Sequence, residues 1–239
     1  MIKSPMHPTA RSIGRKSEAG FNLIELLITI SILSVLIAIG TTAIKSAMQK
    51  ADDVRCIANL RQVGVGMAAY CGENSGALPG PLLPSQGPRY NRVADGPFTA
   101  YLANYLFPYL DIPAPQSGAL PSLQDARRIA PMFFCPAFAK AAKNNFANSY
   151  FMRWKIGGLG NMPPWGNYGT TIPQYPIRLT SIPSPMNTWA MCDIDVQCPD
   201  LPAVSWSSSL PEAPIHRNRR NALFFDWHVG KIAANGEVL

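Results

Sequence analysis

The chain has 239 residues, a formal net charge of +7 and 47% hydrophobic residues. After a leader and a long helix, about 165 residues remain, which is enough for one compact domain. The charge excess is modest and no dense basic run with interleaved aromatic residues occurs, so the composition argues against a nucleic-acid partner.

The chain begins with a basic leader, residues 1–20, followed by an apolar stretch over residues 21–44. The basic residues of the leader are Lys3, Arg11, Arg15 and Lys16. No small-residue cleavage site follows the apolar stretch, so it is not an ordinary secretory signal and is retained. About 24 residues at 1.5 Å each can span a bilayer. The leader bases predict a single pass with the N-terminus in the cytoplasm.

One acid, Glu25, lies within the otherwise uncharged stretch. A carboxylate in bilayer hydrocarbon costs roughly 2.5–3.5 kcal/mol, so Glu25 is expected to have a partner. If the chain were cut after Gly20, Phe21 would carry a free α-amino group. A neighbouring subunit in an axially staggered bundle could bring that cation to Glu25. The pattern therefore indicates a processed assembly element more than a simple anchor.

Residues 20–27, Gly-Phe-Asn-Leu-Ile-Glu-Leu-Leu, resemble the prepilin cleavage and methylation motif of type IV pilins and type II secretion pseudopilins. Asn22 stands where that motif usually has Thr. The resemblance implies cleavage between Gly20 and Phe21 by a prepilin peptidase, followed by N-methylation of Phe21. It also implies assembly with other pilin-like subunits through Glu25 and its apolar helix. It covers only the start of the chain.

Residues 45–72 are predicted to continue the helix as an amphipathic extension. Its apolar stripe has spacings near three and four and comprises Met48, Val54, Ile57, Leu60, Val63, Met67 and Tyr70. The opposite, polar face comprises Lys50, Asp52, Asp53, Arg55, Arg61 and Gln62. Gly64 and Gly66 weaken the helix locally. One helix over about residues 21–71 is favoured over two helices broken near Gly40.

Residues 73–239 form the predicted exported domain, whose many prolines prevent long regular elements. A short helix is expected within residues 99–110, a short edge strand or buried turn at 132–136 and a buried strand at 189–193. A β-hairpin is predicted over residues 222–232. The fold class is therefore α+β: a long N-terminal helix, membrane-spanning in its first half, packed on a loop-rich, Pro-rich domain with a small antiparallel sheet.

The hairpin turn contains Asp226 and Trp227. A two-residue type I′ turn needs positive φ at the second position, which glycine supplies cheaply and tryptophan does not. The turn is therefore predicted to be strained or of another type. Alternation along the strand predicts Phe224 facing the core, with Leu223 and Phe225 on the opposite side.

His216, nine intervening residues and Asp226 resemble the H-X9-DG motif that closes a group of pilin-like proteins. Trp227 departs from that motif at its glycine. His216, Asp226 and His228 are also the only closely spaced His/Asp set, and could bind a divalent metal. We favour structural roles, in which Asp226 caps its own turn and His216 bonds to a neighbouring loop.

Other polar clusters are weaker signals. A calcium site could use Asp193, Asp195 and Asp200, but the EF-hand spacing and its glutamate are absent. Three arginines, Arg217, Arg219 and Arg220, are expected to form a solvated strand flank in preference to a phosphate site. The loop at 157–160 has no strand–helix context for phosphate binding.

The five cysteines are Cys56, Cys71, Cys135, Cys192 and Cys198. Cys192 and Cys198 are close enough in sequence to close a small disulfide loop, if the domain is exported. Cys56 is interpreted as a small apolar helix residue. No spacing indicates a zinc ribbon or a redox pair.

These patterns predict a structural pilin-like subunit in a type IV pilus-like or type II secretion pseudopilus-like filament. It would lie in the inner membrane, with its C-terminal domain periplasmic or extracellular. No catalytic residue, metal or cofactor is assigned. Two alternatives remain: a membrane-anchored extracytoplasmic binding module and, with less support, an exported enzyme using a metal at His216, Asp226 and His228.

Overall fold

A computed structural model of the chain describes residues 22–90, 100–114, 128–143, 148–160, 163–168 and 174–239. The chain forms two compact units, Met1–Ser46 and Ala47–Leu239. The leader, Gly20 and Phe21 lie outside the described residues.

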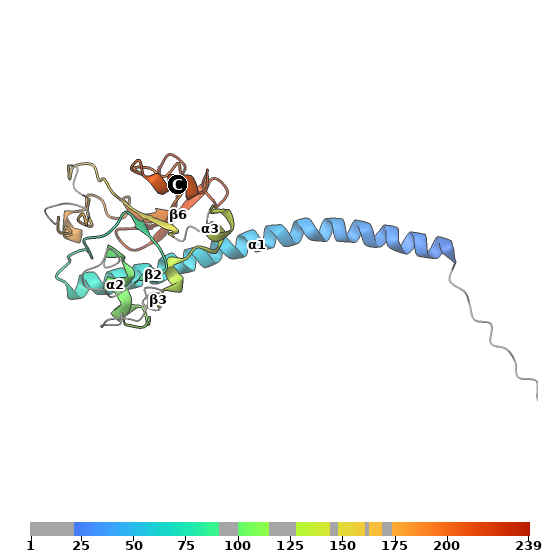
Figure 1. Cartoon of the computed structure of the whole chain (residues 1–239), viewed down its shortest axis with the longest axis horizontal. Coiled ribbons are helices and arrows are strands. Elements are labelled where there is room, and N and C mark those ends of the chain that lie inside the picture. The colour runs from blue at the N-terminus through green and yellow to red at the C-terminus, as the bar shows by residue number, and fades with distance from the viewer. Residues whose placement is uncertain (1–21, 91–99, 115–127, 144–147, 161–162, 169–173) are drawn as a thin grey trace, which may run out of the picture. The chain divides into compact units, whose positions relative to one another are not determined.

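Helix α1 (Leu23–Glu73) is a single α-helix of 51 residues (Figure 1). The prediction of one helix is confirmed, and the alternative break near Gly40 does not occur. In the first unit, the large apolar side chains from Leu23 to Ile44 are exposed.

In the second unit, the buried face of α1 differs from the predicted stripe. Its buried residues are Asp52, Cys56, Leu60, Val63, Gly64, Gly66, Met67 and Cys71. The assignment of Met48 and Val54 to this face was wrong, since both are exposed. Asp52 and Asp53 were placed on the solvated face, yet Asp52 is buried and Asp53 half-buried. The reason is angular: positions 52, 56, 60, 63 and 67 share one helix face at 3.6 residues per turn.

The main sheet has five antiparallel strands in the order β1-β4-β5-β6-β7. The strands are β1 (Ser85–Gln86), β4 (Tyr150–Met152), β5 (Trp189–Asp193), β6 (Arg219–Phe224) and β7 (Val229–Ala233). A separate pair joins β2 (Arg89–Tyr90) to β3 (Arg128–Ile129). The predicted α+β class, the buried strand at 189–193 and the C-terminal hairpin are confirmed.

The short helices are α2 (Ala103–Leu106), η2 (Phe107–Tyr109), η3 (Pro131–Phe133), α3 (Pro136–Ala141), η4 (Leu179–Ser181) and η5 (Ser205–Ser209). The helix expected within residues 99–110 is therefore present. At 132–136 the buried-turn alternative holds, because the chain forms a 3-10 turn that leads into α3.

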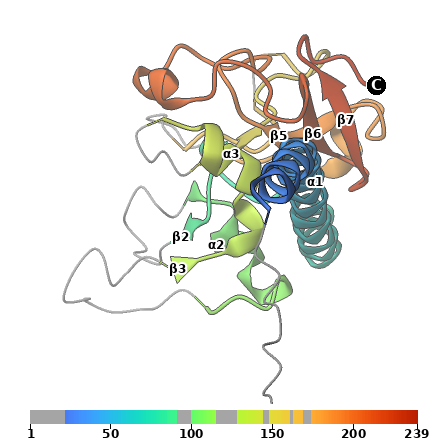
Figure 2. The same cartoon turned by 90° about the vertical axis from the view of Figure 1, so that its right-hand side faces the viewer.

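Two helical glycines mark where the second half of α1 meets the domain on two sides. A Cβ on Gly64 would lie 2.9 Å from Leu223 Cδ1 of β6 and 3.0 Å from the Trp227 carbonyl oxygen. A Cβ on Gly66 would lie 2.8 Å from Leu110 Cδ2, just after η2. Figure 2 looks along α1, with β5, β6 and β7 on one side of it and α2 on another. These glycines permit close packing, although each lowers helix propensity.

The sheet is covered on both faces around the hairpin. Leu223, Phe224 and Phe225 are all fully buried. Leu223 faces α1, Phe224 stacks on His228 with ring centroids 4.3 Å apart, and Phe225 stacks on Trp165 at 5.3 Å. Phe224 is buried as predicted and Leu223 contacts α1, and the side of the strand opposite Phe224 is packed as well.

The hairpin turn has three loop residues instead of two. The Phe224 N–H donates to the His228 carbonyl at 2.9 Å, and the Trp227 N–H donates to the Phe224 carbonyl at 3.0 Å. Trp227 has φ of 70°, the left-handed position that usually takes glycine in three-residue hairpin loops. The alternative of another turn type is therefore confirmed, and the Trp227 backbone contacts α1 at the position of Gly64.

Candidate functional site

His216 lies in a buried polar cluster between α1 and the sheet. Its Nδ1 is 3.2 Å from Asp53 Oδ1, and its Nε2 is 3.4 Å from both Asp193 Oδ2 and Cys135 Sγ. Burial lowers the pKa of His216, although the Asp53 carboxylate acts in the opposite direction. A neutral imidazole is favoured, with its Nδ1 facing Asp53.

The two carboxyl groups around His216 differ in charge. Burial raises the pKa of Asp193 to about 8, even though the Asn221 N–H donates to its Oδ2 at 2.8 Å. Burial alone would raise the pKa of Asp53 as well, but hydrogen bonds from Asn221 and Lys231 outweigh that effect and lower it. Near neutral pH, Asp53 is ionised and Asp193 keeps its proton.

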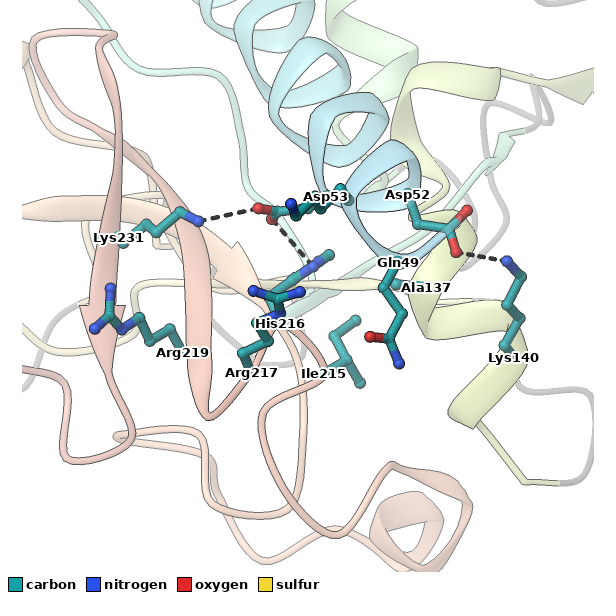
Figure 3. Close-up of a pocket in the computed structure, with 11 residues that line it drawn as sticks. Gln49, Asp52, Asp53, Ala137, Lys140, Ile215, His216, Arg217, Arg219 and Lys231 are labelled. Carbon is teal, nitrogen blue, oxygen red and sulfur yellow. Dashed lines mark hydrogen bonds and ion pairs between the residues drawn. The ribbon is translucent and has the colours of Figure 1, made fainter. Parts of the chain in front are cut away.

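A cavity of about 610 Å³ opens beside this cluster (Figure 3). It is lined by Gln49, Lys50, Asp52, Asp53, Ala137, Lys140, Ile215, His216, Arg217, Arg219 and Lys231. Asp52 pairs with Lys140 of α3, and Asp53 pairs with Lys231 of β7 at 3.0 Å. The cavity therefore lies between α1, α3, the turn before β6 and β7.

Cys56 of α1 and Cys135 form a disulfide beside His216. The interpretation of Cys56 as an ordinary apolar helix residue was wrong, because Cys56 is disulfide-bonded. Its partner lies 79 residues away in sequence, so local spacing gave no sign of the bond. Cys192 and Cys198 are free, with their sulfur atoms 3.5 Å apart, so the small disulfide loop does not form.

The structure does not assemble the suggested metal site. Asp226 Oδ1 lies 2.5 Å from His228 Nδ1 and accepts the His228 backbone N–H, so Asp226 caps its own turn as expected. In the described part of the chain, the one group of three closely spaced His, Cys or acidic ligands is Cys56, Cys135 and His216. A disulfide has no thiolate to offer a metal, so this oxidised form lacks the necessary donors.

Arg217 and Arg219 are exposed as expected, but Arg220 is buried, and the three acids of the disfavoured calcium site have separate partners. Asp195 pairs with Arg220, which is fully buried, while Asp200 lies 3.5 Å from Arg153. Asp193 faces His216 instead. Each acid therefore serves a different cation or imidazole, because successive strand and loop positions point in different directions.

At the N-terminus of α1, Asn22 and Glu25 form a reciprocal cap. The Asn22 side-chain oxygen accepts the Ile24 N–H at 3.2 Å, and Glu25 Oε2 accepts the Asn22 N–H at 3.3 Å. This is the capping-box arrangement, with a polar N-cap residue and a glutamate three positions later. Asn, like Thr, is a good N-cap, which accounts for Asn22 in physical terms.

The start of α1 matches a known motif. By length and composition, α1 contains a segment able to cross a membrane. A family model described as the prokaryotic N-terminal methylation motif matches residues 15–41. The chain has the N-terminal segment of a type IV pilin-like protein. The motif and the exposed apolar helix together indicate that this protein is membrane-anchored.

No curated protein and no solved structure matches the chain. The motif match ends before the second unit begins at Ala47, so roles for that domain rest on its geometry. Asp53 and Lys140 line the cavity, although neither was predicted as a site residue. For Asp53 the sequence did contain a signal. The pair Asp52-Asp53 lies about one helical turn before Cys56 and Leu60, on the face of α1 that packs against the domain.

Proposed function

We propose that this protein is a structural pilin-like subunit that a prepilin peptidase cleaves between Gly20 and Phe21. Phe21 is then N-methylated, and the N-terminal half of α1 assembles with other pilin-like subunits. The product is a type IV pilus-like or type II secretion pseudopilus-like filament. One observation carries the proposal: the methylation motif lies on a helix whose large apolar side chains between Leu23 and Ile44 are exposed.

In this proposal the protein crosses the inner membrane once, with its N-terminus in the cytoplasm and its domain in the periplasm or outside the cell. The bases of the leader support this orientation. The buried disulfide between Cys56 and Cys135 is compatible with an oxidising compartment for the domain. The domain has a structural role, and no catalytic residue or cofactor is assigned to it.

Glu25 would set the axial register by neutralising the Phe21 amine of a neighbouring subunit. Among the described residues, its carboxylate accepts one long hydrogen bond, from the Asn22 N–H at 3.3 Å. No ion pair joins Glu25 to a cation within the described part of the chain, and an unpaired carboxylate is costly in hydrocarbon. Helix capping and inter-subunit pairing are therefore two separable roles of one side chain.

Three variants separate these roles. Glu25→Gln keeps a capping side chain but removes the charge, Glu25→Val removes both, and Asn22→Ala removes the N-cap while keeping the charge. Each variant is co-expressed with a prepilin peptidase, and intact mass is used to verify a chain that begins at Phe21. Assembly is then measured by the sheared-filament yield and by subunit pull-down from membranes.

We expect both Glu25 variants to insert in the membrane normally, because insertion no longer requires burial of a charge. Both should lose most of their assembly, because the Phe21 amine of the neighbouring subunit no longer has a carboxylate to pair with. Asn22→Ala should assemble at close to the normal level. Normal assembly of Glu25→Gln would refute charge pairing. A wild-type chain that still begins at Met1 would refute the processing step.

A further inference from the structure

The cavity beside His216 is strongly basic. Five of its lining side chains are Lys or Arg and two are Asp, and both acids already have cations of their own. His216 adds no charge, since burial lowers its pKa. Within the described residues, Lys50, Arg217 and Arg219 line the cavity with no ion partner. These three cations are therefore available to an external anion.

The two arginines are held at the cavity by an unusual turn. Arg217 has φ of 55° and Asn218 has φ of 65°, two consecutive non-glycine residues in the left-handed region. That conformation is unfavourable for residues with a Cβ, and such strain concentrates at sites where side-chain placement matters. Arg219 follows as the first residue of β6, and Figure 3 places it with Arg217 on the same side of the cavity as Lys231.

The cavity begins just beyond the apolar segment of α1. Ile44 is the last residue of that segment, and Gln49 and Lys50 line the cavity. Five or six residues of α-helix correspond to about 8–9 Å along the axis. The polar headgroup layer on each side of a bilayer is about 5–8 Å thick. A helix inserted to Ile44 therefore places these residues at the level of lipid phosphates.

We propose that this cavity binds the phosphate of an anionic lipid headgroup in the membrane leaflet next to the domain. Arg217 and Arg219 would donate charge-assisted hydrogen bonds to the phosphate oxygens, and Lys50 would approach from α1. Bound lipid would hold the domain of an unassembled subunit against the bilayer. This inference rests on the membrane insertion that is part of the proposed function.

The test uses the full chain purified in a non-ionic detergent. Calorimetric titrations use short-chain phosphatidylglycerol, short-chain phosphatidylcholine and inorganic phosphate as probes, at low and at moderate salt. The site variants are Arg217→Gln/Arg219→Gln and, independently on α1, Lys50→Gln. The control, Arg61→Gln/Lys155→Gln, removes two exposed positive charges away from the cavity. Thermal melts without lipid identify any variant that has lost its fold.

Phosphatidylglycerol should bind the wild-type chain and the control alike, and binding should weaken as salt rises. The double arginine variant should raise the dissociation constant at least about tenfold, and Lys50→Gln should raise it by a smaller factor. Phosphatidylcholine should bind much more weakly, because its choline cancels the phosphate charge. Processing at Phe21 and assembly should be unchanged in the site variants.

Three results would overturn the inference. Equal binding of phosphatidylcholine would indicate interaction with the acyl chains. Free phosphate that binds as tightly as phosphatidylglycerol would mean that the cavity takes the soluble anion. Loss of binding in the control as well would indicate a general charge effect. Failure of processing or assembly in the wild-type chain would instead count against the proposed function, because the titrations do not depend on either step.

Discussion

The carboxylate of Asp195 holds the guanidinium of Arg220 at two points, with Nε 2.6 Å and Nη2 2.8 Å from its two oxygens. Both side chains are almost completely buried. Arg220 Nη1 also donates to the carbonyl oxygens of Ala233 and Ala234, at 3.1 and 2.9 Å. One guanidinium therefore ties the loop after β5 to the end of β7.

Removing this arginine should be among the most destabilising single changes in the domain. Arg220→Met would leave Asp195 buried without its cation, which typically lowers the free energy of unfolding by about 3–5 kcal/mol. Arg219→Met, on the same strand but exposed, should change it by less than about 0.5 kcal/mol. Urea unfolding of the two variants in detergent measures the difference, and similar losses in both would contradict the assigned role of Arg220.

Contact between α1 and the hairpin predicts opposite effects of alanine at two helical glycines. Gly64→Ala would bring a Cβ against Leu223 and the Trp227 backbone, and should destabilise the domain by about 1–3 kcal/mol. Gly72→Ala meets nothing within 4 Å, and should be neutral or stabilise by up to about 1 kcal/mol because alanine favours helix. Thermal melts decide, and a harmless Gly64→Ala would mean that the hairpin yields easily.

The raised pKa of Asp193 predicts that the free energy of unfolding falls as pH rises. Its pKa is about 8 in the folded chain against 3.8 as the ordinary value, so the folded state binds the additional proton between these values. The contribution of this proton to the free energy of unfolding is fully present below about pH 4 and is lost as pH rises through about 8. His216 acts in the opposite sense, because its lowered pKa costs stability only as pH falls below about 6.5.

The window from pH 6.5 to 8 therefore isolates Asp193 from His216. There the free energy of unfolding should fall by up to about 1.4 kcal/mol per pH unit. Asp193→Asn, which keeps an acceptor for the Asn221 N–H, should flatten this slope. Urea unfolding across the window measures it. An unchanged slope in the variant would show that another group is responsible.

The disulfide between Cys56 and Cys135 predicts a response to reductant. It closes a long loop, so its removal in Cys56→Ala/Cys135→Ala should cost about 2–5 kcal/mol and make the melting temperature independent of dithiol reductants. Cys192→Ala removes a free thiol and should leave the response to reductant intact. If reductant lowers the melting temperature of the double variant as much as that of the wild type, a different cysteine pair carries the effect.

Local sequence patterns were sufficient to predict the structure of the N-terminal part of the chain. The apolar run with Glu25 and the continuous helix depend on neighbours within about one helical turn, so the order of residues predicts them. The same is true of the C-terminal hairpin and of Asp226 as a turn cap. Gly64 has a second role that local patterns do not reveal: it lowers helix propensity, but it also lets β6 and the hairpin turn approach α1 closely.

By itself the sequence determined the long helix, its membrane-length apolar segment, the methylation motif and an α+β domain rich in loops. Only the tertiary structure decided that Cys56 pairs with Cys135, that Asp195 pairs with Arg220 and that Asp53, His216 and Lys231 meet at a basic cavity. These partners lie far apart along the chain, and their pairing depends on which faces of α1 and of the strands are brought together when the core closes. No periodicity of 3.6 or 2 residues encodes that choice, because it is made by packing between elements.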